Sequence, residues 1–224
     1  MQDFGFSDDK LVLIYNSLFY DKQLKIRNKL TPSTLYKDHF GNELPVILYL
    51  GRIQKSKKVD QLVEAVKLLK NQNSPFNLVI VGKDVENNEI PKLANDYGLN
   101  DNIWFYGPCY DEEEIGPLIF NSAVCVSPGL IGLMAIHSLT YGTPVITCDA
   151  FSSHGPEFEA IDDGVTGSFF KEDDLDDLCE AITHWTTISK SKREKVRLNA
   201  YKVIDEKYNA HAQIQIIKTT LNLV

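Results

Sequence analysis

The sequence has few of the features that mark several common classes of protein. No apolar run approaches the roughly 20 residues that a membrane-spanning helix needs, and the acidic start of the chain does not resemble a signal peptide. The net charge is −8, from 23 basic and 31 acidic side chains, with no basic stripe to offset it. Such a chain repels a phosphate backbone, so we expect no nucleic acid partner. We also expect a cytoplasmic location.

Metal sites and nucleophile motifs are equally scarce. The four cysteines, at positions 109, 125, 148 and 179, lie far apart, with no Cys-x-x-Cys pair and no His at metal-ligand spacing. We expect buried, reduced thiols and no metal. There is no Gly-x-Ser-x-Gly elbow, no Walker lysine motif and no Gly-x-Gly-x-x-Gly after the first predicted strand.

What the chain does contain is a regular alternation of short apolar runs and helical patterns. Continuous apolar runs are typical of parallel strands covered on both faces, and they predict strands at 11–15, 46–50, 77–81, 103–106, 123–126, 144–147 and 167–170. Helices are predicted at 21–30, 59–71, 89–97, 111–121, 133–141 and 175–186, followed by two more with a break near Asn209. The alternation predicts an α/β fold, a doubly wound parallel sheet with helices on both faces.

Two acidic clusters precede or open predicted helices. Asp111 to Glu114 and Asp173-Asp174 place negative charge where the helix dipole favours it. We interpret both clusters as helix caps rather than as paired carboxylates for acid/base chemistry.

The first candidate binding loop follows the predicted strand 46–50. Ligands of an open parallel sheet bind beyond the carboxyl ends of the strands, and here the segment GRIQKSKKVD places Arg52 and Lys57 in one loop. A planar guanidinium beside an ammonium suits a diphosphate. A solvated, Lys-rich loop is the alternative.

The second candidate loop follows the predicted strand 123–126 and reads SPGLIGLMAIHSLTYGTPV. Gly129 and Gly132 would let the backbone approach a phosphate at the start of the next helix. The alternative is a tight turn in which the glycines serve only geometry. His137 lies about one helical turn further on, where its ring could bind a hydroxyl or simply pack against the sheet. His154 could border the site, although it is more simply a loop residue.

Five segments, in this order, carry a resemblance to a known family: LYLGRIQKSKKVDQLVEAV, NLVIVGKD, LNDNIWFYGPCYDEEEIGPL, NSAVCVSPGLIGLMAIHSLTYGTPVITCDA and FEAIDDGVTGSFF. Together they closely resemble the C-terminal, nucleotide-sugar-binding domain of retaining glycosyltransferases of the GT-B fold, of the glycosyl transferases group 1 type. The resemblance implies an interdomain crossover strand and helix at 1–44, a Rossmann-like donor-binding domain at 45–186, and closing helices at 187–224. We expect the N-terminal acceptor domain to be absent from this chain, so that the chain binds nucleotide without efficient transfer.

The resemblance also implies roles for individual residues. Arg52 and Lys57 would hold the donor diphosphate and stabilise the leaving group as charge develops, a catalytic role by electrostatics. Glu159, shortly before the Asp163-Gly164 turn, would be structural. The remaining donor-binding residues are expected at the end of the first core strand, in the loop that reads the base, and along the glycine turn and its helix: Gly51, Pro108, Cys109, Tyr110, Gly129, Leu130, Ile131, Gly132, Leu133 and His137.

Three positions depart from the family pattern. Where the family has one Glu that contacts the donor sugar and a second that contacts the ribose, this sequence has Gly129 and His137. His137 could take over a ribose contact, whereas Gly129 cannot replace a carboxylate. Lys58 stands where a Gly is usual, which is a milder change.

The leading hypothesis is the donor-binding half of a hexosyl-type glycosyltransferase. It would move a sugar, with retention, from a nucleoside-diphosphate sugar, expected to be UDP-linked, to a glycan or lipid-linked acceptor in polysaccharide assembly. No metal or other cofactor is needed in that scheme, and any peripheral membrane contact would be made by the acceptor domain. The alternatives are a non-catalytic nucleotide-sugar-binding or assembly domain and, less in keeping with the residues present, a GT-B sugar-nucleotide epimerase.

Overall fold

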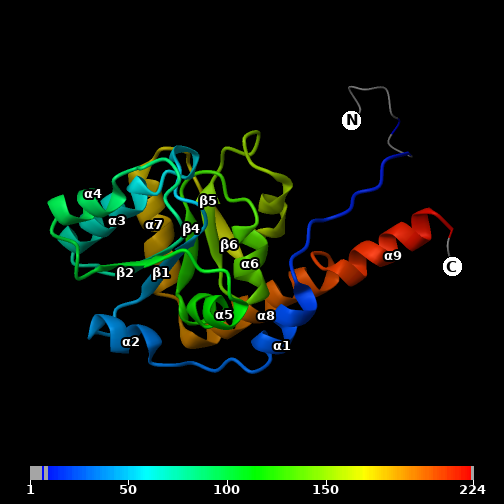
Figure 1. Cartoon of the computed structure of the whole chain (residues 1–224), viewed down its shortest axis with the longest axis horizontal. Coiled ribbons are helices and arrows are strands. Elements are labelled where there is room, and N and C mark those ends of the chain that lie inside the picture. The colour runs from blue at the N-terminus through cyan, green and yellow to red at the C-terminus, as the bar shows by residue number, and fades with distance from the viewer. Residues whose placement is uncertain (1–6, 8–9, 223–224) are drawn as a thin grey trace.

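A six-stranded, all-parallel sheet forms the centre of the computed structural model, which describes residues 7 and 10–222 (Figure 1). The strand order is β3-β2-β1-β4-β5-β6. The strands are β1 (Val46–Leu50), β2 (Asn77–Val81), β3 (Ile103–Gly107), β4 (Val124–Ser127), β5 (Val145–Cys148) and β6 (Gly167–Phe170). The predicted doubly wound parallel sheet is confirmed.

The helices form two groups whose members contact one another. One group contains α3 (Asp60–Asn71), α4 (Ile90–Asp96) and α7 (Leu175–Thr186), and the other contains α1 (Tyr20–Arg27), α2 (Leu35–Phe40), α5 (Glu112–Asn121), α6 (Met134–Thr140) and α8 (Lys190–Glu206). The two groups cover opposite faces of the sheet, and α9 (Ala210–Thr220) extends away from it (Figure 1).

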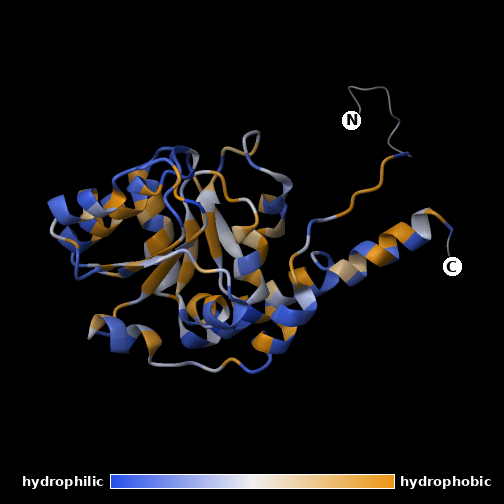
Figure 2. Ribbon diagram, viewed as in Figure 1, coloured by the Kyte–Doolittle hydropathy of each residue, from blue (hydrophilic) through white to orange (hydrophobic). Residues whose placement is uncertain are grey.

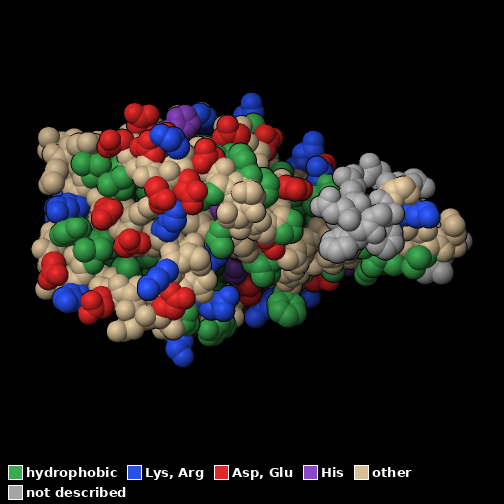
Figure 3. Space-filling model, turned by 90° about the horizontal axis from the view of Figure 1, so that it is seen from above, with side chains coloured by type: hydrophobic (Ala, Val, Ile, Leu, Met, Phe, Trp, Pro, Cys, Tyr) green, Lys and Arg blue, Asp and Glu red, His purple; other side chains and the backbone are tan. Residues whose placement is uncertain are grey.

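The continuous apolar runs form the central strands because both faces of the sheet are covered. Ile47, Leu48, Leu78 and Val79 are fully buried. Apolar residues gather on the strands and on the inward sides of the helices, whereas the outward sides are hydrophilic (Figure 2). Over the face seen from above, basic and acidic side chains are interspersed (Figure 3).

The helix caps follow the predictions. The side chain of Asp111 accepts a hydrogen bond from the backbone N–H of Glu113 at 3.1 Å, and Asp174 accepts one from Asp177 at 3.1 Å. Asn209 caps α9 in the same way, and this explains the break between the last two helices. The sequence places each of these short polar side chains where a helix must begin.

The predicted strand at 11–15 is wrong. These residues pair with no strand in the described part of the chain, and Val12, Leu13 and Ile14 are 50%, 58% and 45% exposed. Both edges of the sheet are formed by other strands, β3 and β6, and the segment runs away from the sheet (Figure 1). The first residues of the predicted 1–44 part and the last two of the predicted 187–224 part lie outside the described residues.

The other differences between the predicted and the observed elements are small. The helix predicted at 21–30 begins at Tyr20 and ends at Arg27, and α2 was not predicted because it has only six residues. Cys125, Cys148 and Cys179 are buried as expected, but Cys109 is partly exposed. Within the described residues, no helix combines the length and the apolar character needed to span a bilayer.

The topology defines one crevice at the carboxyl ends of the strands. β1 lies between β2 and β4, and the chain leaves β1 toward α3 on one face but leaves β4 toward α6 on the other. The connections therefore diverge between β1 and β4, which is the topological switch point where doubly wound sheets bind ligands.

Candidate functional site

The two candidate binding loops meet at this switch point. They are the β1–α3 loop (residues 51–59) and the β4–α6 loop (residues 128–133). The backbone N–H of Gly129 donates to the carbonyl oxygen of Lys57 at 3.1 Å, and that of Leu130 donates to Ser56 at 3.0 Å. The Lys57 ammonium in turn donates to the carbonyl oxygen of Leu130. The structure therefore brings together two segments that lie about 70 residues apart in the sequence.

Lys57 is a half-buried cation at this junction. Burial lowers the pKa of its ammonium, the nearby positive charge of Arg52 lowers it further, and the carboxylate of Glu157 acts in the opposite direction. Among the described residues, neither Arg52 nor Lys57 forms an ion pair. Two neighbouring cations without a protein counter-ion favour an anionic ligand.

The end of β1 fixes the backbone from which Arg52 projects. Gly51 has a φ of 154° and donates its N–H to the carbonyl oxygen of Val81 at 2.9 Å. The buried Tyr49 hydroxyl donates to the carbonyl oxygen of Arg52 at 2.7 Å. A Cβ on Gly82 would lie 1.8 Å from the carbonyl oxygen of Gly51, so this close approach requires glycine. The guanidinium itself stays exposed.

The glycine turn offers free backbone donors at two of its predicted residues. Gly132 has a φ of 56°, and a Cβ there would lie 3.6 Å from the Lys57 ammonium. No acceptor in the described part of the chain takes the N–H of Gly132 or Leu133. The N–H groups of Gly129, Leu130 and Ile131 are used within the protein. The Lys57 ammonium thus lies beside Gly132, in the turn that carries these two donors.

Gly129 has no space for a side chain. A Cβ at this position would lie 2.1 Å from the carbonyl oxygen of Ser56 and 2.9 Å from the Cα of Lys57. The Gly129 carbonyl oxygen accepts a hydrogen bond from the Thr147 hydroxyl at 3.1 Å. A carboxylate at residue 129 is therefore incompatible with the observed contact between the two loops.

His137 is engaged away from the glycine turn. Its Nε2 lies 3.0 Å from Oε2 of Glu112 on α5, and its side chain is 13% exposed. The same carboxylate accepts hydrogen bonds from the Tyr141 hydroxyl at 2.7 Å and from Gln23 at 3.0 Å. Glu112 is thus more than the capping residue that the sequence indicated, because it links α1, α5 and α6.

The predicted base-reading loop lies between β3 and α5. Tyr110 is 87% exposed, and the sulfur of Cys109 makes two long contacts, of 3.5 Å to the Glu114 carboxylate and 3.9 Å to the carbonyl oxygen of Asp111. Like Pro108, both residues are at the same edge of the sheet as the two binding loops. No hydrogen bond within the described residues connects this loop to the glycine turn.

The loop after β5 contacts the glycine turn through His154, which the sequence offered as a possible border of the site, whereas the sequence analysis did not single out Glu157. His154 Nδ1 accepts from the backbone N–H of Ile131 at 3.3 Å, and its Nε2 lies 2.9 Å from the carbonyl oxygen of Cys148. This pattern corresponds to the neutral ring with its proton on Nε2. Glu159 is exposed, whereas Glu157 is 8% exposed and is the buried carboxylate of this segment. The signal available in the sequence for Glu157 was its position, shared with His154, after a strand that neighbours β4.

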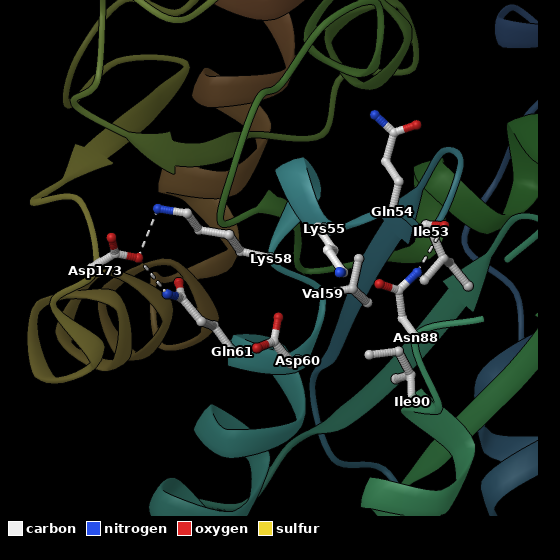
Figure 4. Close-up of a pocket in the computed structure, with 10 residues that line it drawn as sticks. All are labelled: Ile53, Gln54, Lys55, Lys58, Val59, Asp60, Gln61, Asn88, Ile90 and Asp173. Carbon is white, nitrogen blue, oxygen red and sulfur yellow. Dashed lines mark hydrogen bonds and ion pairs between the residues drawn. The ribbon is translucent and has the colours of Figure 1, made fainter. Parts of the chain in front are cut away.

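A pocket of about 370 Å³ is lined by residues of the β1–α3 loop and the start of α3, and by Asn88, Ile90 and Asp173 (Figure 4). Lys58 pairs there with Asp173 at 2.7 Å and with Glu172 at 2.8 Å, and Gln61 donates to Asp173 at 2.8 Å. Figure 4 shows Lys58 and Gln61 pointing toward Asp173. Because Lys58 is already paired with carboxylates and neither Arg52 nor Lys57 lines this pocket, we do not assign the anion site to it.

The family described as glycosyl transferases group 1 matches residues 35–203. An uncharacterized 41.2 kDa protein in the cps region of Klebsiella pneumoniae is 26% identical over 223 residues, covering 97% of this chain and 57% of that protein. An alpha-D-kanosaminyltransferase of Streptomyces kanamyceticus is 25% identical, covering 79% of this chain and 45% of the enzyme. The chain spans about half the length of these curated relatives.

Solved structures share the fold. A glycosyltransferase from Rickettsia africae superposes with a TM-score of 0.77 at 20% identity, covering 97% of this chain and 59% of that one. Anabaena Alr3699/HepE, solved in complex with UDP, superposes with a TM-score of 0.77 at 18% identity, covering 100% and 60% of the two chains.

Proposed function

Because the chain belongs to the glycosyl transferases group 1 family, we propose that it forms the donor-binding half of a glycosyltransferase that uses a nucleoside-diphosphate sugar. One observation supports this most directly. Within the described residues the Lys57 ammonium forms no ion pair, and it lies beside Gly132 in a turn whose N–H groups at Gly132 and Leu133 have no acceptor there. Cations and backbone donors arranged together suit a diphosphate.

In this proposal the two cations act on the leaving group. Lys57 and Arg52 hold the diphosphate, and they stabilise the negative charge that develops on it as the bond to the sugar breaks. The residues at the site supply no nucleophile, in keeping with retention by attack of the acceptor hydroxyl on the face from which the diphosphate departs. A diphosphate oxygen would accept the proton of that hydroxyl, and no metal takes part.

The nucleotide that we propose is UDP. Two of the structurally similar proteins, Anabaena Alr3699/HepE and a TarM variant of S. aureus, were solved with UDP. The relative in the cps region of Klebsiella pneumoniae is the reason for proposing a role in assembling surface polysaccharide. The base would be read at Pro108, Cys109 and Tyr110, which lie at the same edge of the sheet.

The acceptor would be bound by another domain. The curated relatives are longer than the part that this chain matches, and α9 has no buried side chain in the described structure. We propose that residues 45–186 form the donor domain, while the segment before α1 and the helix α9 contact the acceptor domain. Transfer would then take place in the cleft between the two domains.

Gly129 favours a second candidate function. Since no side chain fits at this position, the glycine turn supplies no carboxylate to a donor sugar. A non-catalytic domain that binds a nucleotide sugar without transferring it would also tolerate this arrangement. The acceptor-dependent release of UDP by the whole enzyme would distinguish the two candidates.

Titration calorimetry with UDP tests the proposed site. We expect the chain to bind UDP with a dissociation constant in the micromolar range, between roughly 1 μM and 1 mM as is usual for enzyme substrates. Lys57→Ala should weaken binding about tenfold to hundredfold, because a hydrogen bond to a charged group is worth about 1.5–3 kcal/mol. Lys55→Ala removes an exposed cation from the same loop and should leave the affinity unchanged. An absence of binding at about 1 mM UDP would contradict the proposal.

A further inference from the structure

Glu157 is a buried carboxylate beside the loops of the candidate site. It lies in the 3₁₀ helix η4 (Pro156–Ala160), which follows β5 and packs against α6. His154 connects the start of the same segment to the glycine turn through the N–H of Ile131, at 3.3 Å. The segment that carries Glu157 is therefore in direct contact with the turn beside Lys57.

The position of this carboxylate is fixed. Oε1 of Glu157 accepts a hydrogen bond from the Asn16 side chain at 3.0 Å, and the residue is 8% exposed. Oε2 lies so close to Gly155 that a Cβ there would be 2.5 Å away. No donor among the described residues contacts Oε2. One oxygen thus orients the group and the other remains available.

The charges around Glu157 narrow the choice of ligand. Its carboxylate attracts the Lys57 ammonium, as the influence on the pKa of Lys57 shows, and it forms no ion pair within the described part of the chain. A carboxylate repels a diphosphate, so Glu157 is not suited to the anionic part of a nucleotide sugar. An ionised carboxylate has only acceptors, and these suit hydroxyl donors such as those of a sugar ring.

The glycine turn cannot supply this contact. The Cα of Gly129 packs against the backbone of Lys57 and leaves no space for a side chain. A polar side chain that reaches a sugar attached to the diphosphate must therefore come from a neighbouring element. The loop after β5 is such an element, since β5 is hydrogen-bonded to β4 and shares its carboxyl edge.

We propose that Glu157 recognises the sugar of the donor, with its free Oε2 accepting hydrogen bonds from the ring hydroxyls. Asn16 is a positioning residue that orients the carboxylate. The inference rests on the proposed function, because it requires a nucleotide sugar whose diphosphate is held at Lys57. It assigns sugar recognition to a different loop from the one that holds the phosphates.

The test compares the affinity for UDP with that for four UDP-sugars: UDP-glucose, UDP-galactose, UDP-N-acetylglucosamine and UDP-glucuronic acid. We expect the whole chain to bind at least one of the three neutral sugars more tightly than UDP, and to bind the glucuronic acid conjugate less well. Glu157→Gln should reduce that preference about tenfold or more, while the affinity for UDP is unchanged or slightly higher. Glu159→Gln, on the same 3₁₀ helix but exposed, should keep the wild-type preference.

The outcomes separate this inference from the proposed function. If both the wild-type chain and Glu157→Gln bind UDP tightly and show the same sugar preference, the inference alone is overturned. It is also overturned alone if the wild-type chain binds UDP and all four conjugates with equal affinity. A parallel loss of UDP and UDP-sugar binding in Glu157→Gln would also overturn it, since that indicates a structural role. Failure of the wild-type chain to bind any of these compounds would overturn the proposed function as well. Asn16→Ala should shift the sugar preference in the same direction as Glu157→Gln, but less.

Discussion

At Gly129 the backbones of two loops come into contact, and the lack of a side chain makes this contact possible. The N–H of Gly129 donates to Lys57, and the loops are so close that a Cβ would lie 2.1 Å from the carbonyl oxygen of Ser56. The same contact brings the Lys57 ammonium to the carbonyl oxygen of Leu130. Gly129 therefore determines where the candidate phosphate-binding cation lies.

A side chain at position 129 should displace this cation. Gly129→Ala is expected to destabilise the chain by about 1–3 kcal/mol, the usual cost of overpacking, and to weaken UDP binding. Gly98→Ala is the control, because Gly98 has a φ of 65° but nothing within 4 Å of a Cβ. It should lower stability by roughly 1–2 kcal/mol through backbone strain alone and leave UDP binding unchanged. Urea unfolding and titration calorimetry measure the two effects. Unchanged UDP binding in Gly129→Ala would contradict this account.

The residues of the site were predictable to different degrees. Arg52, Lys57 and the glycines could be found from the sequence because they directly follow strands whose apolar runs are unambiguous. The hydrogen-bond partner of His137, which is Glu112, could not be predicted from the sequence, because the contact depends on how α5 packs against α6. The same limit applies to Glu157, because its hydrogen-bond partner Asn16 lies 141 residues away in the sequence.

At the scale of the elements, one carboxylate connects three helices. Glu112 at the start of α5 accepts hydrogen bonds from Gln23 of α1, from His137 of α6 and from Tyr141 at the end of α6. Burial raises the pKa of the Glu112 carboxyl, but these hydrogen bonds outweigh burial, so that the pKa lies below its ordinary value of 4.5. The ionised form is thus favoured in the folded chain.

This linkage predicts a specific dependence of stability on pH. A carboxyl whose pKa is lower in the folded state contributes stability above its unfolded pKa, and the contribution disappears as the pH falls through the folded value. Glu112→Gln should therefore lower the free energy of unfolding by roughly 1.5–3 kcal/mol at neutral pH, and the difference from wild type should shrink below pH 4.5. Urea unfolding over a range of pH measures this. Glu113→Gln, an exposed neighbour, should show no such narrowing. A difference that is constant with pH would contradict the role of Glu112.

The residue that follows Lys57 in the β1–α3 loop has an unusual backbone conformation. Lys58 has a φ of 49°, a conformation that favours glycine, and its ammonium pairs with Glu172 and Asp173 in the β6–α7 connection. The ion pairs are partly exposed, so they contribute at most about 1 kcal/mol. The backbone strain of a non-glycine residue costs roughly 1–2 kcal/mol.

These two effects predict an unusual order of stability. Lys58→Ala loses the ion pairs and keeps the strain, whereas Lys58→Gly loses the ion pairs and relieves the strain. Lys58→Gly should therefore be more stable than Lys58→Ala by roughly 1 kcal/mol, although Gly is normally the less stabilising residue. Urea unfolding of the two variants decides the matter. An Ala variant as stable as the Gly variant would show that the loop relaxes out of the observed conformation.

At the scale of the whole molecule, the sheet was predictable because its central strands are local apolar runs that need no knowledge of their partners. The segment 11–15 has the same local pattern, yet it pairs with no strand in the described part of the chain, because an apolar run alone does not specify a partner strand. The exposed side chains of Val12, Leu13 and Ile14 resemble those of Ile214 and Ile217 on α9 and of Leu221 just after it, which are 51%, 41% and 60% exposed.

The donor domain should fold without α9. No side chain of α9 is buried, whereas Val196, Ala200 and Ile204 of α8 are buried, and α8 packs against α6. A chain truncated after Asn209 should keep a thermal midpoint within about 4 °C of that of the full chain, which corresponds to roughly 1 kcal/mol for a protein of this size. It should also bind UDP with unchanged affinity. Truncation after Ser189 removes α8 as well and should abolish cooperative unfolding, because each large buried side chain contributes about 1.5–3 kcal/mol. Circular dichroism on heating measures both. A large loss of stability on removing α9 alone would mean that its exposed apolar side chains stabilise the donor domain itself. The proposal that α9 contacts an acceptor domain would then lose its support.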